Sequence, residues 1–437
     1  MTAPFSQRTV SRRTLLKAMA SVPTLSLPTL LPAQTPELSL TIPDATPQQL
    51  AVDESFWRTV ANYYDRTEGV INLEHGYWGK MARPVQTAYL EATRFVNAQN
   101  SFYARKQYGA DLQISVARVA DALGAQPDEI VLTRNATEAI HNLLRQYQGL
   151  QAGDGILLAD VDYPSFKTTV RWLADERQLQ TVEVQLPWRA SQQEILDRYV
   201  QAFEAHPNLK LMLLTHVSNQ HGLTLPVAAI AEQAKSRGID VICDSAQSWG
   251  LLDFNINDLN VDWAGFNLHK WLGSPVGVGA LYMRRGSLAK IAPYPGEEDP
   301  ENTRAATSIH TATSNFAAMM VVPEAIAFHQ KLGPANKEAR LRYLRAAWTA
   351  PAEQMPHIEV LGGKDEQSWS GMGAFRLRGQ SSAAEVNQLQ QRLENEFGIF
   401  TVGRFGLADG ACIRITPQVF TSREEVQQLV AALEQLA

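Results

Sequence analysis

The sequence predicts an α/β protein, in which a mostly parallel sheet has helices on both faces and a smaller α+β domain follows at the C-terminal end. Between residues 129 and 283, short apolar segments alternate with segments of helical periodicity, which is the pattern of successive β-α-β units. Beyond residue 283 this alternation loosens. The 437 residues are enough for a large core and two lobes.

The part of the chain before this alternation is predicted to be mainly helical. We expect a linker or extended arm at 35–50, helices at 54–64, 84–97 and 112–123, and a short strand at 70–73. Pro84 suits a helix start, because the first helical position needs no N–H donor. The expected organisation is a signal segment, an N-terminal arm with helices, a large domain and a small C-terminal domain, at 1–34, 35–100, 101–308 and 309–437.

The alternating region supplies the strands of the predicted sheet. These strands are expected at 129–133, 155–158, 211–215, 240–243, 263–266 and 279–283. A helix is expected at 227–237, where Gly238 fits the C-terminal cap. After an exposed loop at 293–307, we expect helices at 317–330, 334–350 and 423–436, and strands at 358–361, 373–376 and 412–415.

Two charged residues, Asp244 and Lys270, follow neighbouring apolar strands. In open α/β sheets, ligands bind outside the carboxyl ends of the strands. A desolvated lysine can lose its proton and attack a carbonyl carbon, and a carboxylate can keep a pyridine nitrogen protonated. Pyridoxal phosphate (PLP) requires this combination. For either residue taken alone, a surface salt bridge is the alternative interpretation.

The residues around this pair resemble those of the class V, fold-type I PLP enzymes, which include cysteine desulfurases, kynureninase and isopenicillin N epimerase-like proteins. That family carries Asp-x-Ala-Gln followed by Ser/Asn-x-His-Lys, and this chain has Asp244-Ser-Ala-Gln247 and Asn267-Leu-His269-Lys270. The resemblance implies that Lys270 forms the Schiff base with PLP and that Asp244 pairs with the ring nitrogen. It also implies that Gln247 faces the ring hydroxyl oxygen, while Asn267 and His269 approach the phosphate.

A strand, a polar turn and a helix start are predicted around the segment Arg-Asn-Ala-Thr-Glu at 134–138. A helix N-terminus attracts anions through its free N–H groups and its dipole, although an ordinary N-cap explains the same residues. By resemblance to the family's Gly-Thr-Thr-Glu segment, the N–H groups of Ala136 and Thr137 and the Thr137 hydroxyl bind the PLP phosphate. Tyr163 matches the family's aromatic residue that stacks on the PLP ring, with loop packing as the alternative.

Four further residues are candidates for the substrate side of the site. Asn219, in the family-like segment His-Val-Ser-Asn at 216–219, is expected near the ring and the substrate carboxylate. Arg414 matches the family's arginine for the α-carboxylate, which a guanidinium can hold with two hydrogen bonds. Arg404 is a candidate for a second anionic group. Tyr77 lies in a segment, 73–79, that resembles the family pattern L-N-x-G-x-x-G, and it either walls the substrate site or packs in a turn.

Thr313 is the candidate for a contact between subunits. It lies in the segment 309–316, Ile-His-Thr-Ala-Thr-Ser-Asn-Phe. This segment resembles the family's Gly-Thr segment, with Ala312 in place of glycine. In relatives that threonine reaches the phosphate of the other subunit, so the resemblance implies a homodimer with an active site shared across the interface.

Composition excludes several classes of protein. The net charge of −6 gives no support for nucleic-acid binding. The two cysteines, Cys243 and Cys412, are too few for a disulfide scaffold and have no zinc-site spacing, so we expect no metal and interpret both as small buried residues. The loop at 402–411 contains no cysteine, which argues against the sulfur-accepting chemistry of the desulfurases.

The N-terminus resembles an export signal. Ser-Arg-Arg-Thr-Leu-Leu-Lys at 11–17 precedes an apolar run that is too short to span a bilayer. The twin arginines resemble the Tat signal S-R-R-x-F-L-K, with Leu15 in place of phenylalanine. Cleavage is expected near Ala33. A chance basic N-terminus is the alternative, whereas Tat export implies a periplasmic enzyme that leaves the cytoplasm folded and without stable membrane association.

The predicted reaction is PLP chemistry on an α-amino acid or a small peptide. An exported member of the epimerase-like group resembles the PLP enzymes that tailor pyoverdine siderophores in the periplasm (the PvdN type), which act on a glutamyl residue with free α-amino and α-carboxylate groups. The expected product is a succinamide, by oxidative decarboxylation, or a keto acid, by transamination. The alternatives are an isopenicillin N epimerase-like racemase, a general aminotransferase, and a non-catalytic exported binding protein.

Overall fold

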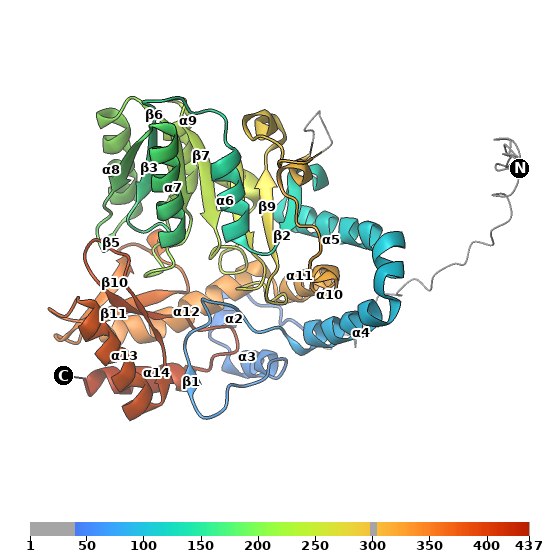
Figure 1. Ribbon diagram of the computed structural model, residues 1–437. Helices are drawn as coiled ribbons and strands as arrows, with labels where there is room; N and C mark the ends of the chain where they lie inside the picture. Colours follow the sequence, from blue (N-terminus) through green and yellow to red (C-terminus); the bar gives the residue numbers. More distant parts are fainter. Residues whose placement is uncertain (1–39, 298–303, 437) are drawn as a thin grey trace, which may run out of the picture. The chain divides into compact units, whose positions relative to one another are not determined.

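The computed structural model describes residues 40–297 and 304–436 (Figure 1). The predicted signal segment at 1–34 lies outside the described residues. The described chain forms a seven-stranded sheet, a five-stranded sheet and one pair of short strands. Across these two stretches, no helix has both the length and the apolar character needed to cross a membrane.

The seven-stranded sheet has the strand order β2-β9-β8-β7-β6-β3-β4. Its strands are β2 (Ile130–Thr133), β3 (Gly155–Ala159), β4 (Gln180–Val184), β6 (Leu209–Thr215), β7 (Asp240–Ser245), β8 (Trp263–Asn267) and β9 (Gly279–Met283). In this sheet β9 runs antiparallel to both of its neighbours, and every other neighbouring pair is parallel. The predicted mostly parallel sheet is therefore confirmed.

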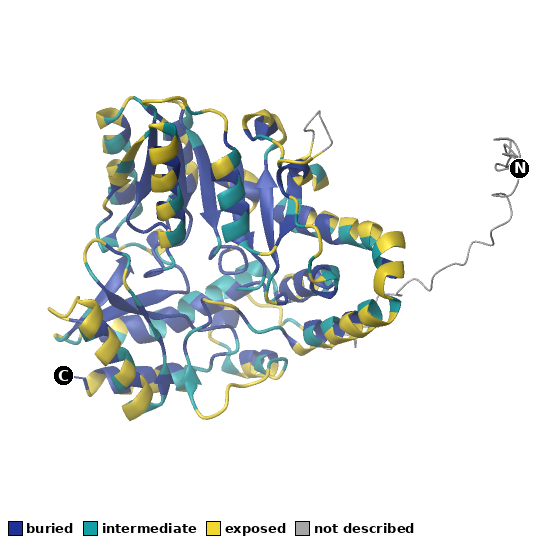
Figure 2. Cartoon of the chain, viewed as in Figure 1, coloured by how far each residue is buried: buried dark blue, intermediate teal, exposed yellow. Residues whose placement is uncertain are grey.

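Helices cover both faces of this sheet, as predicted (Figure 1). They are α5 (Tyr108–Leu123), α6 (Ala136–Gln146), α7 (Pro164–Arg177), α8 (Gln192–Ala205) and α9 (Val227–Lys235). Leu157 and Met212 pack in one core with residues of α5, α8 and α9, whereas their chain neighbours Ile156 and Leu211 pack in another core with residues of α6 and α7. This alternation follows from the two-residue period of a strand, and Figure 2 shows the central strands as buried.

The second sheet has the order β13-β14-β11-β10-β5. Its strands are β5 (Arg189–Ala190), β10 (Ile358–Gly363), β11 (Gly373–Leu377), β13 (Val402–Arg404) and β14 (Cys412–Ile415). The pairs are antiparallel apart from β10 with β5. Residues of α12 (Pro334–Ala352), α13 (Ala383–Phe397) and α14 (Arg423–Glu434) share its core. This arrangement is the predicted C-terminal α+β region, to which β5 adds a strand from much earlier in the chain.

The N-terminal arm packs against this C-terminal region. Here α2 (Pro47–Ala51) contacts α12, and β1 (Ile71–Asn72) pairs in parallel with β12 (Ile399–Phe400). Between them lies α3 (Glu54–Ala61), and α4 (Arg83–Lys106) follows. The pairing of β1 leads the next residues, 73–79, towards β14, where the backbone of Glu74 bridges to Thr416.

Two sequence expectations need correction, and one strand was missed. A linker or extended arm was expected at 35–50, but α2 begins at Pro47, because Thr46 and Gln49 form a capping box and Pro47 suits the first helical turn. The helix expected at 317–330 is two helices, α10 (Phe316–Met320) and α11 (Val322–Leu332). Pro323 has no N–H for a helical hydrogen bond to the preceding turn, so it lies in the first turn of a new helix. The sequence analysis also missed β4, whose side chains are mostly exposed and polar at the sheet edge.

Candidate active site

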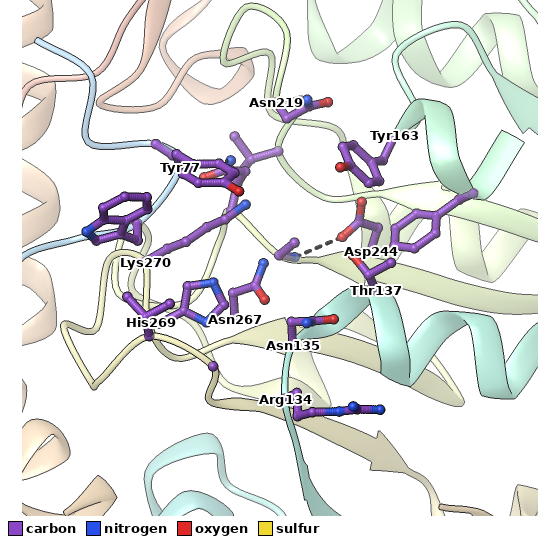
Figure 3. A pocket seen from close by; sticks show the side chains of 18 of the residues that line it. Tyr77, Arg134, Asn135, Thr137, Tyr163, Asn219, Asp244, Asn267, His269 and Lys270 are labelled. Carbon is purple, nitrogen blue, oxygen red and sulfur yellow. Dashed lines mark hydrogen bonds between the residues drawn. The ribbon is translucent and has the colours of Figure 1, made fainter. Parts of the chain in front are cut away.

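A cavity of about 400 Å³ lies at the carboxyl ends of β6, β7 and β8 and at the start of α6. Figure 3 shows Lys270 and Asp244 pointing into it from neighbouring strands. The candidate residues that line this cavity are Tyr77, Thr137, Tyr163, Asn219, Asp244, Gln247, Asn267, His269, Lys270, Arg404 and Arg414. The two candidates outside the lining are Ala136 and Thr313.

Asp244 is the buried acid of the site. It lies near the end of β7, and its Oδ1 accepts a hydrogen bond of 2.9 Å from the Ala246 N–H. Burial raises the pKa of Asp244 to about 6, although that N–H and the Lys270 ammonium both favour the charged form. A cationic ring nitrogen placed beside this carboxylate adds a further charge that favours its ionised form.

Lys270 follows β8 and extends into the cavity (Figure 3). Burial, together with the Arg414 and Arg404 guanidinium groups, lowers the pKa of its amine to about 7, although Asp244 and Glu74 act in the opposite direction. An amine with this pKa is largely neutral at slightly alkaline pH, which is the form that attacks a carbonyl carbon. Gly79 packs tightly against the backbone of Lys270. A Cβ atom added at Gly79 would lie only 2.0 Å from the Lys270 carbonyl oxygen.

Some of the N–H groups at the start of α6 already donate hydrogen bonds to acceptors within the protein. The Asn135 Oδ1 accepts from the Glu138 N–H at 2.8 Å, as an N-cap does. The Ala136 N–H, which was expected to bind phosphate, donates instead to the Asn267 Oδ1 at 2.9 Å. This hydrogen bond connects α6 to β8. It occupies the N–H group of Ala136, and Ala136 does not line the cavity. Thr137 does line it.

Three other candidates for cofactor binding differ in their hydrogen-bond partners within the protein and in their exposure. Gln247 donates to the Gly76 carbonyl oxygen at 2.9 Å and accepts from the Trp271 indole N–H at 2.8 Å, so its amide also holds the segment 74–79 in place. The His269 Nδ1 lies 2.8 Å from the Val278 carbonyl oxygen, which fixes the ring orientation. The Tyr163 side chain is 39% exposed and contacts Phe166 edge-on, so much of its ring surface is available within the cavity.

Arg414 and Arg404 line the cavity, and a residue that the sequence analysis did not single out, Glu74, pairs with both without itself being among the lining residues. Arg414 is fully buried on β14, and its Nη1 donates to the Asn219 carbonyl oxygen at 2.7 Å. Its Nη2 donates to the Glu74 Oε1 at 2.5 Å. The Arg404 Nη2 lies 3.9 Å from the same oxygen. One feature of the sequence could have identified Glu74, because a glutamate stands there at the Asn position of the pattern L-N-x-G-x-x-G.

The remaining two candidates are exposed. The Tyr77 side chain is 67% exposed and packs beside Trp78, with 5.1 Å between ring centroids, at the mouth of the cavity. Thr313 is exposed and does not line the cavity of its own chain. The preceding Ala312 has a φ of 49°, a left-handed conformation that favours glycine. A contact between Thr313 and the phosphate therefore requires a second subunit.

The fold and this residue set define a PLP-dependent enzyme of fold type I. A family model for class V aminotransferases matches residues 86–429, and the chain belongs to that family. It is 28% identical over 392 residues to isopenicillin N epimerase from Streptomyces clavuligerus, covering 84% of this chain and 95% of that protein. It is 27% identical to a probable cysteine desulfurase from Vibrio cholerae, with coverages of 72% and 80%.

Solved structures show the same fold. The apo cysteine desulfurase from Thermococcus onnurineus superposes with a TM-score of 0.74 at 21% identity, covering 86% of this chain and 97% of that chain. A mutant of C-DES, with glycine covalently linked to its PLP cofactor, gives a TM-score of 0.71 at 22% identity, with coverages of 84% and 96%. The cavity fits PLP, because it combines an amine of lowered pKa, a buried acid and the start of a helix.

Proposed function

We propose that this enzyme acts on the free α-amino acid end of a glutamyl residue during periplasmic maturation of a pyoverdine siderophore. The supporting observation is the grouping of Lys270, Asp244 and Arg414 around one cavity, since these side chains serve an amine, a ring nitrogen and a carboxylate. The choice of substrate rests on the resemblance of the N-terminus to a Tat signal and on the exposed aromatic residues that line the cavity. The exposed Tyr77 and Trp78 offer apolar surface to a substrate that extends beyond the cavity.

The protein's own groups divide the chemistry between them. PLP, when bound, supplies a ring that withdraws electrons from the α-carbon of an amino acid. Lys270 would hold the cofactor, and its amine is placed to move a proton at the α-carbon of the substrate. Asp244 holds a proton at the ring nitrogen. Arg414 orients the α-carboxylate, which determines the bond at the α-carbon that faces the ring.

Two outcomes fit these groups. In oxidative decarboxylation, the group –CH(NH₂)–COOH and dioxygen give –CO–NH₂, carbon dioxide and water, with dioxygen as the oxidant. In transamination, the same group and a 2-oxo acid give a new 2-oxo acid and a new amino acid. Both reactions require a lysine base, an acid at the ring nitrogen and a carboxylate anchor, so we keep both as products to be tested.

Desulfurase chemistry is disfavoured despite the cysteine desulfurases among the relatives. Cys412 lies nearest in sequence to Arg414, but it is completely buried in β14. Burial raises the pKa of this thiol to about 12, whereas sulfur transfer needs a thiolate. Cys243 is buried in β7, with a similarly raised pKa.

Three alternatives remain as competing hypotheses, and one of them is a general aminotransferase that acts on another amino acid. An amino acid racemase is supported by the isopenicillin N epimerase relatives, and a non-catalytic binding protein is compatible with the fold alone. A racemase is expected to exchange the α-hydrogen of an amino acid for solvent deuterium without forming a keto acid or an amide. A binding protein is expected to leave the PLP absorption spectrum unchanged when amines are added.

The remaining contacts of the proposal concern the cofactor and the assembly. Thr137 and His269 contact the PLP phosphate, Tyr163 stacks on the ring, and Asn219 lies beside the substrate carboxylate. Thr313 of one subunit reaches the phosphate bound by the other, in a homodimer that the Tat machinery exports folded. Ala136 takes part only if Asn267 releases its N–H.

The test is mass spectrometry of the glutamyl pyoverdine precursor after incubation in air with the purified, PLP-loaded mature protein. Loss of the carboxyl carbon, with the nitrogen kept as an amide, indicates oxidative decarboxylation. Formation of a keto acid, in the presence of a 2-oxo acid, indicates transamination. If the precursor is unchanged while free amino acids turn over, the siderophore assignment is wrong and the PLP enzyme class stands.

A further inference from the structure

The buried carboxylate of Glu74 lies between the two arginines of the cavity, and none of the roles described above requires it. Its Oε1 lies 2.5 Å from the Arg414 Nη2 and 3.9 Å from the Arg404 Nη2. The exposed fraction of its side chain is only 8%. Glu74 is not itself among the residues that line the cavity, so a negative charge lies directly against the two cations that this wall presents to the substrate.

The position of Glu74 is fixed from several directions. Its N–H donates to the Asn72 Oδ1 at 2.9 Å, and its backbone bridges to Thr416. The Thr416 hydroxyl lies 3.3 Å from the Glu74 Oε2, and it accepts hydrogen bonds from the N–H groups of His75 and Gly76. The backbone contacts fix the position of residue 74, and the contacts with Arg414 and the Thr416 hydroxyl hold the carboxylate itself against Arg414.

The arginines still have hydrogen-bonding capacity. In the described part of the chain, the buried Nε atoms of both Arg404 and Arg414 have no hydrogen-bond partner. Buried donors normally find an acceptor, and both arginines line the cavity. Two guanidinium groups and one carboxylate carry a net charge of one positive unit, which a single further carboxylate balances.

We propose that Glu74 restricts this wall to one substrate carboxylate. Arg414 holds the α-carboxylate, while Arg404 mainly balances Glu74 and does not bind a second anionic group. A substrate with a second carboxylate close by meets Glu74 as a like charge whose side chain is only 8% exposed, so the repulsion is less screened than between groups in water. The side-chain end of the substrate is therefore uncharged, as in a glutamyl residue whose γ-carboxylate is joined in an amide.

This inference deepens the proposed function and rests on it for the reaction, but its test needs no turnover. Glutarate and its monoamide, glutaramate, have the same shape and differ by one charge. Neither carries an amine, so neither reacts with the cofactor. We expect calorimetric titration of the PLP-loaded protein to give a dissociation constant roughly 10-fold or more lower for glutaramate than for glutarate, because of repulsion by Glu74.

The variant Glu74→Gln keeps the shape of the side chain and removes its charge. We expect it to bind glutarate roughly 10-fold more tightly than the wild type does, and glutaramate within about 3-fold of the wild type. Glu324→Gln is the matched control, because Glu324 is a half-buried glutamate on α11 and the ion pairs of Arg404 and Arg414 involve Glu74 instead. Its ratio of the two dissociation constants should equal that of the wild type.

Three results overturn the inference. They are equal affinity of the wild type for the two probes, an unchanged ratio in Glu74→Gln, and no binding of either probe to the wild type. If Glu74→Gln does not fold, the wild-type ratio still decides, together with Arg404→Gln, which should bind glutaramate roughly 10-fold more weakly because the net positive charge is lost. An unchanged pyoverdine precursor contradicts the proposed function and leaves the probe ratio standing.

Discussion

The charged residues around the cavity form two groups, a cofactor half and a carboxylate half, which differ in whether each charge has an ionic partner. On the cofactor half, Asp244 lies in β7 and Lys270 follows the neighbouring strand β8, and burial is the largest cause that displaces their pKa values to about 6 and about 7. On the carboxylate half, Glu74, Arg404 and Arg414 come from the N-terminal arm and the five-stranded sheet. There each charge has an opposite charge beside it.

The difference shows how burial can serve either reactivity or recognition. A buried group without a close ionic partner titrates near neutral pH and can exchange protons. A buried group with a partner stays ionised and holds a fixed geometry. The cofactor half thus has the properties of a reactive site and the carboxylate half those of a binding site, and the predictions below test this contrast from the largest expected effect to the smallest.

Replacing Lys270 tests the cofactor half most severely. We expect Lys270→Ala to reduce turnover of an amino acid substrate by roughly 10³-fold or more, because both the amine that binds the cofactor and the base at the α-carbon are removed. Steady-state kinetics with added PLP measure this effect. The control is Lys290→Ala, since Lys290 is exposed and pairs with Asp240 far from the cavity lining; equal activity of the two variants contradicts the assignment.

Replacing Arg414 tests the carboxylate half through stability. We expect Arg414→Met to lower the free energy of unfolding by about 3–5 kcal/mol, because Glu74 is left buried without its partner. Adding Glu74→Gln to that variant should restore part of the loss, since the buried carboxylate is then removed and Arg404 is the one charge of the three that remains. Urea unfolding monitored by circular dichroism gives these free energies.

The control for Arg414 is an exposed ion pair. Arg392 and Glu396 pair on α13 at 3.3 Å, and both side chains are largely in solvent. We expect Arg392→Met to change the free energy of unfolding by less than about 1 kcal/mol. A loss in Arg414→Met as small as this, or no recovery in the double variant, means that the Glu74–Arg414 pair does not behave as a buried one.

A substitution at Gly79 tests the packing of the N-terminal arm against the segment that carries Lys270. Its N–H donates to the His269 carbonyl oxygen at 2.8 Å, and an added Cβ collides with the Lys270 carbonyl oxygen. We expect Gly79→Ala to cost about 1–3 kcal/mol in the free energy of unfolding through this overpacking, and to weaken retention of PLP on dialysis. The matched variant is Gly109→Ala in α5, where no atom lies within 4 Å of the added Cβ; it should gain about 0.4–1 kcal/mol.

The pH dependence of cofactor binding tests the coupling between the halves. Because the pKa of Lys270 is lowered to about 7, its amine is neutral above that pH. The rate at which apo-protein takes up PLP should therefore rise with pH through about 7, and level off well below the normal lysine range. Absorbance of the bound cofactor follows this rate.

Arg414→Gln is expected to move that midpoint upward. The Arg414 cation disfavours protonation of Lys270, and its removal also frees Glu74 to favour protonation. Arg392→Gln on α13 should leave the midpoint unchanged. A midpoint that does not respond to Arg414 shows that the carboxylate half has no electrostatic influence on the amine.

Sequence reasoning identified the cofactor half more completely than the carboxylate half. Asp244, Gln247, Asn267, His269 and Lys270 lie within two short segments at the ends of strands, so strand periodicity and local motifs place them together. The state of each group was not predictable in this way. The bond from the Ala136 N–H to Asn267 depends on how α6 packs against β8, and no local pattern of either segment contains it.

The carboxylate half depends on contacts between distant segments. Arg414 was predicted from its own motif, but Glu74 lies 340 positions away, and the two meet because β1 pairs with β12 and the following residues run beside β14. Cys412 shows a case where sequence reasoning sufficed. It was interpreted as a small buried residue, and it is one.

The sequence alone determined the fold class, the alternation of strands and helices, and the chemical identity of the lysine, the acid and the arginine. These features follow from periodicity and from short motifs whose geometry is set by the local backbone. The tertiary structure decided which groups are paired and which remain free to titrate. Pairing and burial depend on segments brought together by packing, and they control charge, because the solvation and the neighbours of each group set its pKa.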